Sequence, residues 1–473
     1  MQQLRTIDFG AKFIYKHYHL KKLKKDNHTK LFIQKSTEYG KWTKKYMASL
    51  GPTFIKLGQV LSTRNDILSQ EFIKEIESLQ DDVTPLPFDD LHYQHHPNIT
   101  KINKNHHKSA SIAQIHLAQL YNGNTVVLKL LRPNIQKQME DDLFFIDKIL
   151  TVASHVFNIN ELQLLKESID RLINETNYTL EIDNADSFYH SMCDLDYVKV
   201  PRVSKKMSND KMIVLECING IKITDTKALD TCGIERTEIC KKLIKSYIHQ
   251  IIKKGFFHAD PHPGNISIDE TGNLIFYDFG LMVEVKSELK PILAQLLVHV
   301  CNKEVKDIVS LSIHSGLIIP TTNVEYIEQF FEILLTYFDH ANIDKLYDEL
   351  WNSQLYKNNN GELPFKLPIE IYYIIKTFVT IEGICVTLDP EFTYASYLNE
   401  MTHELVKDNV TIKNITEQFL QMPIQITTLT KNVYDIQRNN SSLTNTLNKT
   451  QSKIQRLEYI LLYFGILLFQ HFN

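Results

Sequence analysis

Three polar residues in the middle of the chain have the types and the spacing that phosphoryl transfer requires. Asp260 and Asn265 lie in the segment HADPHPGN (258–265), and Asp278 begins the triplet Asp-Phe-Gly. Asp260 could accept the proton of a substrate hydroxyl, while the side-chain oxygens of Asn265 and Asp278 are hard ligands suited to Mg²⁺. The triplet alone is weak evidence, but behind H-x-D-x-x-x-x-N it predicts a kinase-like site. We expect Gly280 to give this loop the freedom that aims the carboxylate of Asp278.

A lysine in an apolar strand supplies a cation for the same site. Lys129 lies in the apolar, β-branched run 124–131, which follows Asn122-Gly123 and predicts a buried strand. Burying its ammonium group is costly unless it meets an anion, although a lone lysine can also extend its stem to reach water. Because Lys129 precedes the two acidic motifs in the order that kinases use, we predict that Lys129, Asn265 and Asp278 hold Mg-ATP.

The patterns around these residues predict the elements that position them. The run 273–277 predicts a strand that delivers Asp278, and the run 212–218 predicts another strand that leads into Asn219-Gly220. Backbone groups of Glu216 and Ile218 in this second run are the candidates for contacts with the adenine base. Apolar spacing predicts helices over 54–61, 291–298 and 372–378.

Two further motifs, upstream of Lys129, carry a family resemblance. The first is K-x-G-Q, formed by Lys56, Gly58 and Gln59, and the second is an alanine-containing loop, Ser109-Ala110-Ser111, followed by Ile-Ala-Gln. With these motifs the chain resembles the UbiB family of atypical kinase-like ATPases, which supports ubiquinone biosynthesis. The resemblance runs from about Leu50 to Leu398.

The resemblance implies a fold, an activity and further site residues. It implies an α+β, two-lobed protein-kinase-like fold with a helical K-x-G-Q extension, ATP and Mg²⁺ as cofactors, Glu181 as the partner of Lys129, and Glu175 as the acidic residue that answers Lys56. Asn177 stands where the family motif E-x-D has aspartate. The alanine loop restricts the backbone freedom that glycine would allow, so Ser109 to Ser111 and the K-x-G-Q helix favour ATP hydrolysis over phosphorylation of a protein in trans.

Composition and charge narrow the class of protein. The chain has 473 residues with 43% hydrophobic and 23% charged, as in globular proteins, and its net charge of −4 argues against a dedicated nucleic-acid binder. Six scattered cysteines without C-x-x-C indicate a reducing compartment. Residues 1–47 hold eleven Lys and one Arg against three acidic residues. This basic segment is either a solvated helix face or a surface for anionic lipid.

The carboxyl end offers a second indication about membranes. Heptad spacing of apolar residues over 426–457 predicts a long amphipathic helix that could form a homodimer or fold back on the chain. The apolar run 459–469 is eleven residues long, shorter than the roughly 20 residues of a membrane span, and could enter one leaflet or pack on protein. We therefore expect peripheral attachment to the cytoplasmic face of a bacterial inner membrane, with a mitochondrial location less favoured because presequences prefer Arg to Lys.

The predicted organisation has four parts: an extension (1–88), a kinase-like N-lobe with inserted helices (89–215), a helical C-lobe (216–405) and the tail (406–473). The expected partners are a membrane surface, ubiquinone-biosynthesis enzymes, and prenylated quinone precursors or other lipids. Two alternatives remain open: a pseudokinase scaffold that binds nucleotide or lipid without turnover, and a small-molecule phosphotransferase.

Overall fold

The computed structural model of the chain describes residues 2–26, 28–62, 68–79, 85–153, 176–320, 323–340, 365–366 and 368–398. The chain divides into two compact units. The first comprises Met1–Lys290, Thr336–Lys345 and Leu367–Tyr397, and the second comprises Pro291–Leu335, Leu346–Lys366 and Leu398–Asn473. All the candidate site residues belong to the first unit. The predicted heptad helix, the apolar run 459–469 and the whole tail (406–473) lie outside the described residues.

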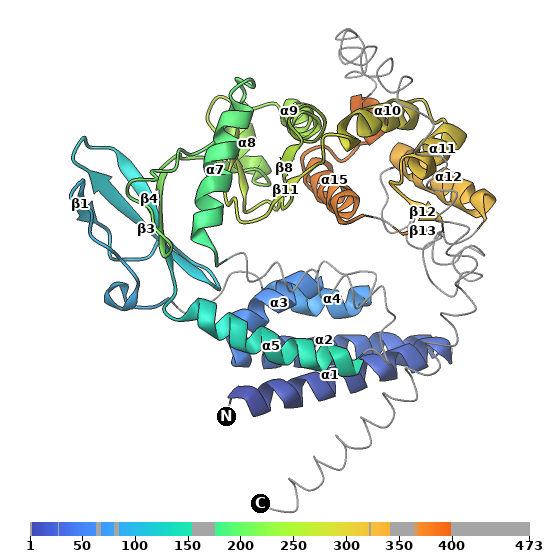
Figure 1. The fold of residues 1–473 in the computed structure, drawn as a ribbon, viewed down its shortest axis with the longest axis horizontal. Coiled ribbons are helices and arrows are strands. Elements are labelled where there is room, and N and C mark those ends of the chain that lie inside the picture. Colours follow the sequence, from blue (N-terminus) through green and yellow to red (C-terminus); the bar gives the residue numbers. More distant parts are fainter. Residues whose placement is uncertain are drawn as a thin grey trace, which may run out of the picture. The chain divides into compact units, whose positions relative to one another are not determined.

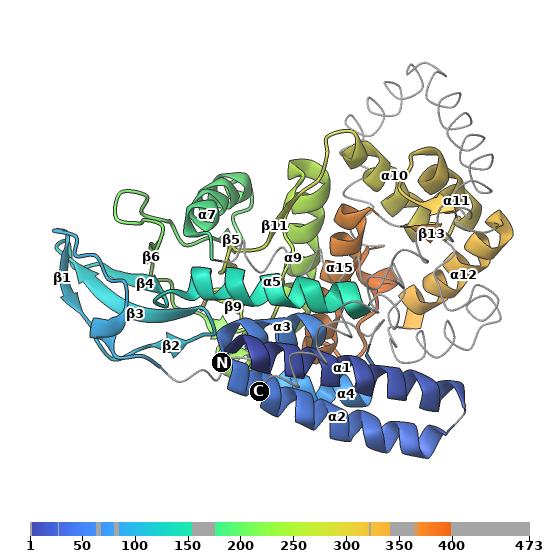
Figure 2. The same ribbon diagram turned by 60° about the horizontal axis from the view of Figure 1, so that its bottom comes forward.

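A group of packed helices forms the beginning of the first unit. Its members are α1 (Gln2–Lys25), α2 (Thr29–Leu50), α3 (Pro52–Ser62), α4 (Gln70–Ile76), followed by η1 (Glu77–Leu79), and α5 (Ile135–Ala153). Helix α2 packs against α1, α3 and α4, and α5 packs against α1 and α3, as Figures 1 and 2 both show. Their apolar faces share one core with Leu131, Tyr178, Ile182 and Ile213. The K-x-G-Q helix α3 is therefore built onto the kinase-like part of the chain and shares its core.

An antiparallel sheet carries Lys129. The strand order is β1 (Ile99–Ile102), β3 (Ala113–Leu120), β4 (Thr125–Leu131) and β6 (Met212–Glu216), with β2 (Lys108–Ser109) paired to β3 and η2 (Phe88–Asp90) before β1. Lys129 lies opposite Ile115 of β3 and Ile213 of β6, so it sits on a central strand. Alternate residues of β4 are buried, which fits the predicted strand over 124–131.

Helix α7 (Tyr178–Met192) brings Glu181 to the sheet. The helix begins after Asn177, whose side chain accepts a hydrogen bond from the Leu180 N–H at 3.1 Å. Asparagine and aspartate are equally good N-caps, so the departure of Asn177 from the family motif keeps the start of this helix intact. Helix α7 packs against β5, β6 and β8, and Phe188 on its inner face is fully buried.

The later part of the first unit holds the loop 258–265, which the sequence predicts to be the catalytic loop, and the Asp-Phe-Gly triplet. Its sheet has the order β5 (Val198–Lys199), β10 (Leu274–Phe276), β9 (Ile266–Ile268) and β7 (Ile221–Lys222), and β8 (Phe256–His258) pairs with β11 (Met282–Glu284). The helices are α8 (Thr226–Thr231), α9 (Arg236–Ile248), the π-helix η3 (His249–Lys254) and α15 (Ile369–Leu388), which packs against α9. The predicted strand over 273–277 is confirmed by β10.

The second unit contains α10 (Leu289–Cys301), α11 (Val305–His314), α12 (Val324–His340) and the short pair β12 (Ile319–Pro320) and β13 (Phe365–Lys366). The helices predicted over 291–298 and 372–378 are confirmed by α10 and α15. All six cysteines are described and carry free thiols.

Helix α15 is the described helix that is long and apolar enough to cross a membrane by length and composition, with a mean hydropathy of 1.5. A stripe along it, including Tyr373, Ile381, Ile384 and Leu388, is buried within the protein. The buried stripe covers part of the helix, since 39% of its apolar window is buried and Ile375, Val379 and Val386 are exposed.

Candidate functional site

Lys129 joins two carboxylates that come from distant parts of the chain. Its Nζ lies 2.6 Å from Oε1 of Glu181 and 3.3 Å from Oδ1 of Asp278. The side chains of Lys129 and Glu181 are 13% and 4% exposed, whereas that of Asp278 is 49% exposed. The structure therefore brings the strand lysine, the α7 glutamate and the Asp-Phe-Gly aspartate together, as predicted.

The charges of this trio depend on one another. Burial alone would lower the pKa of Lys129, but the carboxylates of Asp278 and Glu181 raise it well above its ordinary value. Loss of solvation alone would raise the pKa of Asp278, but the positive charges of Lys129 and Lys56 hold it well below the ordinary range of aspartate. Asp278 is therefore ionised, and its carboxylate is half exposed. A Mg²⁺ ligand needs such an accessible, charged oxygen.

Tyr178 covers the buried side of the ion pair. Its ring centroid lies 5.7 Å from Nζ of Lys129, and the whole residue is inaccessible to solvent. Burial raises the pKa of the Tyr178 hydroxyl far above its usual range. An aromatic wall of this kind excludes water, which strengthens the attraction between Lys129 and Glu181.

The backbone of the Asp-Phe-Gly triplet is held in an unusual conformation. The positive φ in this loop, +58°, falls on Asp278, and Gly280 is not among the residues with positive φ. Our prediction that Gly280 provides the unusual backbone conformation of this loop is therefore wrong, because Asp278 adopts it instead. Instead, the N–H of Gly280 donates to Oδ1 of Asp278 at 3.3 Å, and a Cβ on Gly280 would lie 3.4 Å from that same oxygen.

Two side chains hold the triplet in this conformation. Nε2 of His258 lies 2.8 Å from the carbonyl oxygen of Asp278 and 3.1 Å from that of Tyr277. The amide of Asn184, one turn after Glu181 on α7, donates to the carbonyl of Phe279 at 3.0 Å. Phe279 itself is 1% exposed, with its ring 5.4 Å from that of Phe188. A strained residue persists only where its surroundings fix it, and here they fix the aspartate.

The catalytic loop places Asp260 and Asn265 side by side. The amide of Asn265 donates to the carbonyl of Asp260 at 3.2 Å and to its carboxylate at 3.4 Å. This use of the amide nitrogen leaves Oδ1 of Asn265 as the atom that could bind a cation. Nδ1 of His262 accepts from the Gly264 N–H at 3.1 Å, so both loop histidines have hydrogen-bonding roles that shape the turn.

The alanine loop is fixed by Arg132, the residue that follows the lysine strand β4. The N–H of Ala110 donates to the Ala113 carbonyl at 2.9 Å, which closes the turn between β2 and β3. Arg132 donates from Nε to the carbonyl of Ala110 at 3.0 Å and from Nη2 to the hydroxyl of Ser109 at 2.8 Å. Arg132 is 6% exposed and Ser111 is 5% exposed. The loop is thus tied to the strand that carries Lys129.

The segment predicted to hold adenine uses some of its backbone groups within the protein. The N–H of Glu216 donates to the carbonyl of Arg202 at 2.9 Å, and the carbonyl of Ile218 accepts from the hydroxyl of Tyr277 at 3.0 Å. The predicted adenine contacts are therefore narrowed to the carbonyl of Glu216 and the N–H of Ile218. The Tyr277 contact also ties this segment to the residue before Asp278.

The K-x-G-Q helix brings Lys56 into the surroundings of Asp278. Lys56 is half-buried on α3. Lost solvation acts to raise the pKa of the Asp278 carboxyl, and Lys56 is close enough that its positive charge acts to lower it. Gly58 is buried, and a Cβ there would lie 2.4 Å from Cδ1 of Leu79 and 3.1 Å from Sδ of Met47. Gln59 is half-buried one residue further on, and its carbonyl accepts from the Ser62 hydroxyl at 2.7 Å. Glu175 lies outside the described residues.

Replacing Gly58 with alanine is expected to lower the free energy of unfolding by about 1–3 kcal/mol, because the new methyl group overpacks the contact with Leu79 and Met47. The matched control is Gly383→Ala on α15, where a Cβ meets nothing within 4 Å and alanine is the better helix former by about 1 kcal/mol. Urea unfolding followed by Trp42 fluorescence measures both, in a Trp351→Phe background. Equal effects at the two glycines would contradict the close packing of α3.

Some residues of this arrangement escape prediction from the sequence. Asn184 holds Phe279, and Arg132 holds the alanine loop. The spacing offers a weak signal for Asn184, since it lies three residues after Glu181 and therefore on the same face of the helix. For Arg132 the signal is its place three residues after Lys129 at the end of a strand, where a buried cation needs acceptors.

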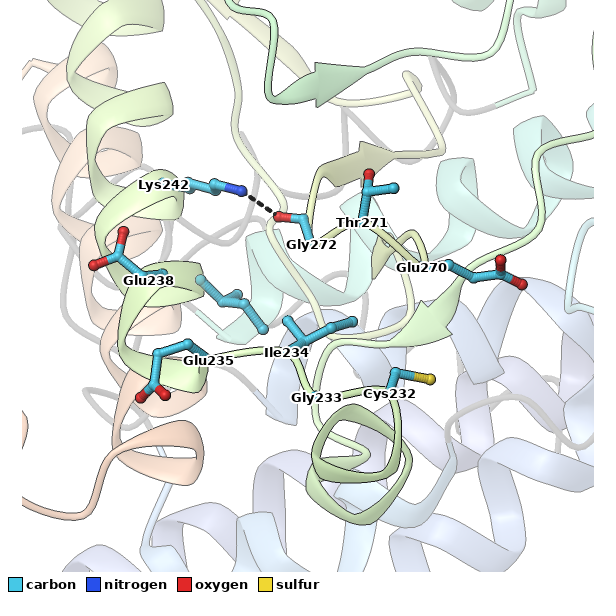
Figure 3. Close-up of a pocket in the computed structure, with 10 residues that line it drawn as sticks. Cys232, Gly233, Ile234, Glu235, Glu238, Lys242, Glu270, Thr271 and Gly272 are labelled. Carbon is cyan, nitrogen blue, oxygen red and sulfur yellow. Dashed lines mark hydrogen bonds between the residues drawn. The ribbon is translucent and has the colours of Figure 1, made fainter.

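A pocket elsewhere in the first unit lies apart from this chemistry. Figure 3 shows it between α9 and the turn that joins β9 to β10, with Lys242 donating to the carbonyl of Gly272 at 2.6 Å. Its acidic lining residues are Glu235, Glu238 and Glu270. None of the candidate site residues around Lys129, Asp260 and Asp278 lines this pocket.

A lysine–glutamate pair beside an Asp-Phe-Gly aspartate, with H-x-D-x-x-x-x-N on the next loop, defines a protein-kinase-like α+β fold. Residues 78–312 match the family model of the ABC1 atypical kinase-like domain. The chain belongs to this family, the UbiB family of atypical kinase-like proteins.

The curated relatives span several groups of organisms. An uncharacterized protein in the hydrogenase 1 5′ region of Clostridium pasteurianum is 35% identical over 372 residues, covering 75% of this chain and 69% of its own. The chloroplastic protein ACTIVITY OF BC1 COMPLEX KINASE 7 of Arabidopsis thaliana is 32% identical over 388 residues, covering 78% of this chain and 55% of its own. The match to a Synechocystis protein covers 66% of that relative. The chain thus spans about half to two thirds of the length of several of these relatives.

A solved structure shares the fold. The complex of Rv3197 with erythromycin from Mycobacterium tuberculosis superposes with a TM-score of 0.53 and 20% identity, covering 70% of this chain and 87% of the other. At this identity the likeness concerns the fold alone, and it agrees with the predicted kinase-like architecture.

Proposed function

We propose that this chain binds Mg-ATP in the cleft around Lys129 and hydrolyses it, as an ATPase or regulatory kinase that supports ubiquinone biosynthesis at a membrane surface. The observation that carries the proposal is the bridge from Lys129 to Glu181 and Asp278 at 2.6 and 3.3 Å. A lysine held by a buried glutamate can bind the phosphates of a nucleotide, and a half-exposed anionic aspartate beside it can bind the metal.

The donor set fits Mg²⁺. Asp278 offers carboxylate oxygen and Asn265 offers an amide oxygen, and Mg²⁺ prefers one or two such ligands together with phosphate oxygens. Held by these two residues, Mg²⁺ would supply positive charge against the phosphates. Asp260, whose carboxylate lies 3.4 Å from the Asn265 amide, is the proposed base that orients the attacking hydroxyl or water.

Hydrolysis is favoured over transfer to a protein in trans. The alanine loop is fixed by Arg132, so it lacks the freedom of a glycine-rich loop over the phosphates. In addition, the positive charge of Lys56 on α3 lies close enough to Asp278 to lower the pKa of its carboxyl. The family resemblance places α3 in the position that a peptide substrate would occupy.

The membrane part of the proposal is supported by the first helix. Leu4, Ile7, Tyr15 and Tyr18 of α1 are 72%, 48%, 67% and 55% exposed, at spacings that place them along the helix surface. They lie within the basic segment 1–47, and each basic residue near an anionic surface contributes about 1 kcal/mol of attraction. A peripheral position on the cytoplasmic face of a bacterial inner membrane accounts for both features. The quinone pathway, its enzymes as partners and a homodimer rest on the family resemblance and the tail sequence.

A phosphate-release assay with and without vesicles tests the proposed function. We expect Mg²⁺-dependent ATP hydrolysis by the full chain, increased several-fold by phosphatidylglycerol vesicles and unchanged by phosphatidylcholine vesicles. The control variant Leu4→Glu/Ile7→Glu should keep the basal rate and lose the stimulation. Binding of Mg-ATP without turnover under all conditions would favour the pseudokinase scaffold, and loss of cellular ubiquinone in a Lys129→Met strain would support the pathway.

A further inference from the structure

A lysine of the apolar helix α15 lies beside the catalytic-loop aspartate. Nζ of Lys376 is 3.9 Å from Oδ1 of Asp260, and the two side chains are 25% and 44% exposed. The family motifs quoted above do not include Lys376, and the residues on both sides of it in α15, Ile375 and Thr377, are uncharged. Its placement therefore asks for a physical explanation.

The packing of α15 fixes where this lysine can reach. Helix α15 packs on α9, where Sγ of Cys240 lies 3.9 Å from the carbonyl of Cys385 and both cysteines are buried. The π-helix η3 continues α9, and its Gln250 side chain accepts from the His258 N–H at 3.0 Å. Helix α15 is thus braced against the same scaffold that holds the catalytic loop, so Lys376 is positioned by a rigid core.

The distribution of charge shows what Lys376 adds. Lys129 and Lys56 both act at Asp278. The loop 258–265, which carries Asp260, contains no Lys or Arg. The oxygens of a γ-phosphoryl group attacked by a water beside Asp260 would carry negative charge. Lys376, beside Asp260, is placed to balance that charge.

The separation between Lys376 and Asp260 leaves both side chains able to bind a further group. A separation of 3.9 Å is longer than a hydrogen bond, and a partly exposed ion pair of this kind contributes only about 0–1 kcal/mol to stability. The ammonium group therefore keeps donors for a phosphate oxygen, and the carboxylate keeps acceptors for a water proton.

We propose that Lys376 is a catalytic residue that binds the γ-phosphate of ATP while Asp260 orients the attacking water; this inference rests on the proposed function. The water oxygen forms a bond to the γ-phosphorus as the bond from that phosphorus to the β–γ bridging oxygen breaks. The bridging oxygen leaves on ADP, and the water proton passes to Asp260 and then to the phosphate product. The side-chain nitrogen of Lys376 binds oxygens of the transferred group and stabilises it.

The test compares Lys376→Gln with the control Lys286→Gln in the full chain. Lys286 is 71% exposed and lies 4.0 Å from Glu370 of the same helix, so its replacement removes an α15 ion pair of the same kind away from the cleft. We expect Lys376→Gln to lower the turnover of Mg-ATP about 30- to 100-fold and to leave the affinity for Mg-ADP within about twofold of the wild type, because ADP lacks the γ-phosphate. Lys376→Arg should restore most of the turnover, and Lys286→Gln should match the wild type.

The possible failures are distinguishable. Turnover in Lys376→Gln equal to or above that of the wild type overturns the inference alone, because the wild type still binds and hydrolyses nucleotide. A parallel loss of ADP affinity and thermal stability, also seen in Lys376→Met, which keeps the aliphatic stem, assigns Lys376 to packing and likewise overturns it. If wild-type protein binds no Mg-ADP, the proposed function fails, and this inference fails with it.

Discussion

Replacing Asp278 with asparagine is expected to reduce Mg²⁺-dependent ATP turnover by at least about 100-fold. Even residues that only support metal ligands cost 10- to 100-fold when they are changed, and Asp278 offers the half-exposed carboxylate of the cleft. Asparagine has the same shape and can still accept from Lys129 and Gly280, so the fold should survive. Nucleotide affinity with and without Mg²⁺, together with turnover, measures the effect.

The matched control for this variant is Asp183→Asn on α7. Asp183 is 64% exposed and pairs with Lys205 at 3.1 Å, so its replacement changes the net charge equally without touching the cleft. Its turnover should equal that of the wild type. A fully active Asp278→Asn protein would show that the metal binds elsewhere.

Acid should affect the wild type and Asp278→Asn differently. Lost solvation alone would raise the pKa of Asp278. The positive charges of Lys129 and Lys56 outweigh this effect and hold the pKa well below the ordinary range of aspartate. Such a carboxylate contributes stability above its unfolded pKa, and this contribution is lost as the pH falls through its folded pKa. The stability advantage of the wild type over Asp278→Asn should therefore shrink below about pH 4. The difference between their urea midpoints across pH measures this.

Breaking the Lys129–Glu181 pair is expected to produce the largest loss of stability. The two side chains are 13% and 4% exposed, and removing one partner of a buried pair typically costs about 3–5 kcal/mol because the other charge remains buried. Lys129→Met should therefore lower the free energy of unfolding by about this amount and abolish turnover. The double variant Lys129→Met/Glu181→Met should recover a large part of the stability and none of the turnover.

Urea unfolding reports this cycle through Trp42, which packs against the core that includes Tyr178 and Ile182; a Trp351→Phe background leaves it as the single tryptophan. The control is Lys205→Met, which breaks the exposed pair with Asp183 and should cost less than about 1 kcal/mol. Additive losses in the double variant would contradict the direct coupling of Lys129 with Glu181.

The elements that carry the site could be predicted from local sequence. The apolar, β-branched run around Lys129 predicts β4, and the apolar run before Asp278 predicts β10, because a short buried strand is recognisable from its own residue types and the turn before it. The partner of Lys129 could not be found in this way. Glu181 is 52 positions away along the chain, and only the family resemblance indicated it.

The conformation of the site depends on contacts between residues that are distant in sequence. The positive φ of Asp278 is fixed by His258 and its neighbours. From the sequence we predicted the unusual conformation at Gly280, because glycine is the residue that most readily adopts a positive φ. Lys376 is similarly hidden, since a single lysine in an apolar helix ordinarily extends to water. Its position beside Asp260 follows from the packing of α15 on α9.

The most direct test of the central claim is calorimetric titration of the full chain with ADP in the presence and absence of Mg²⁺. The arrangement of Lys129, Asp278 and Asn265 predicts one site per chain, with an affinity that rises at least about tenfold when Mg²⁺ is added and a Mg²⁺ effect that disappears in Asp278→Asn. Binding that is indifferent to Mg²⁺, or equally strong in Asp278→Asn, would contradict a metal-nucleotide site in this cleft.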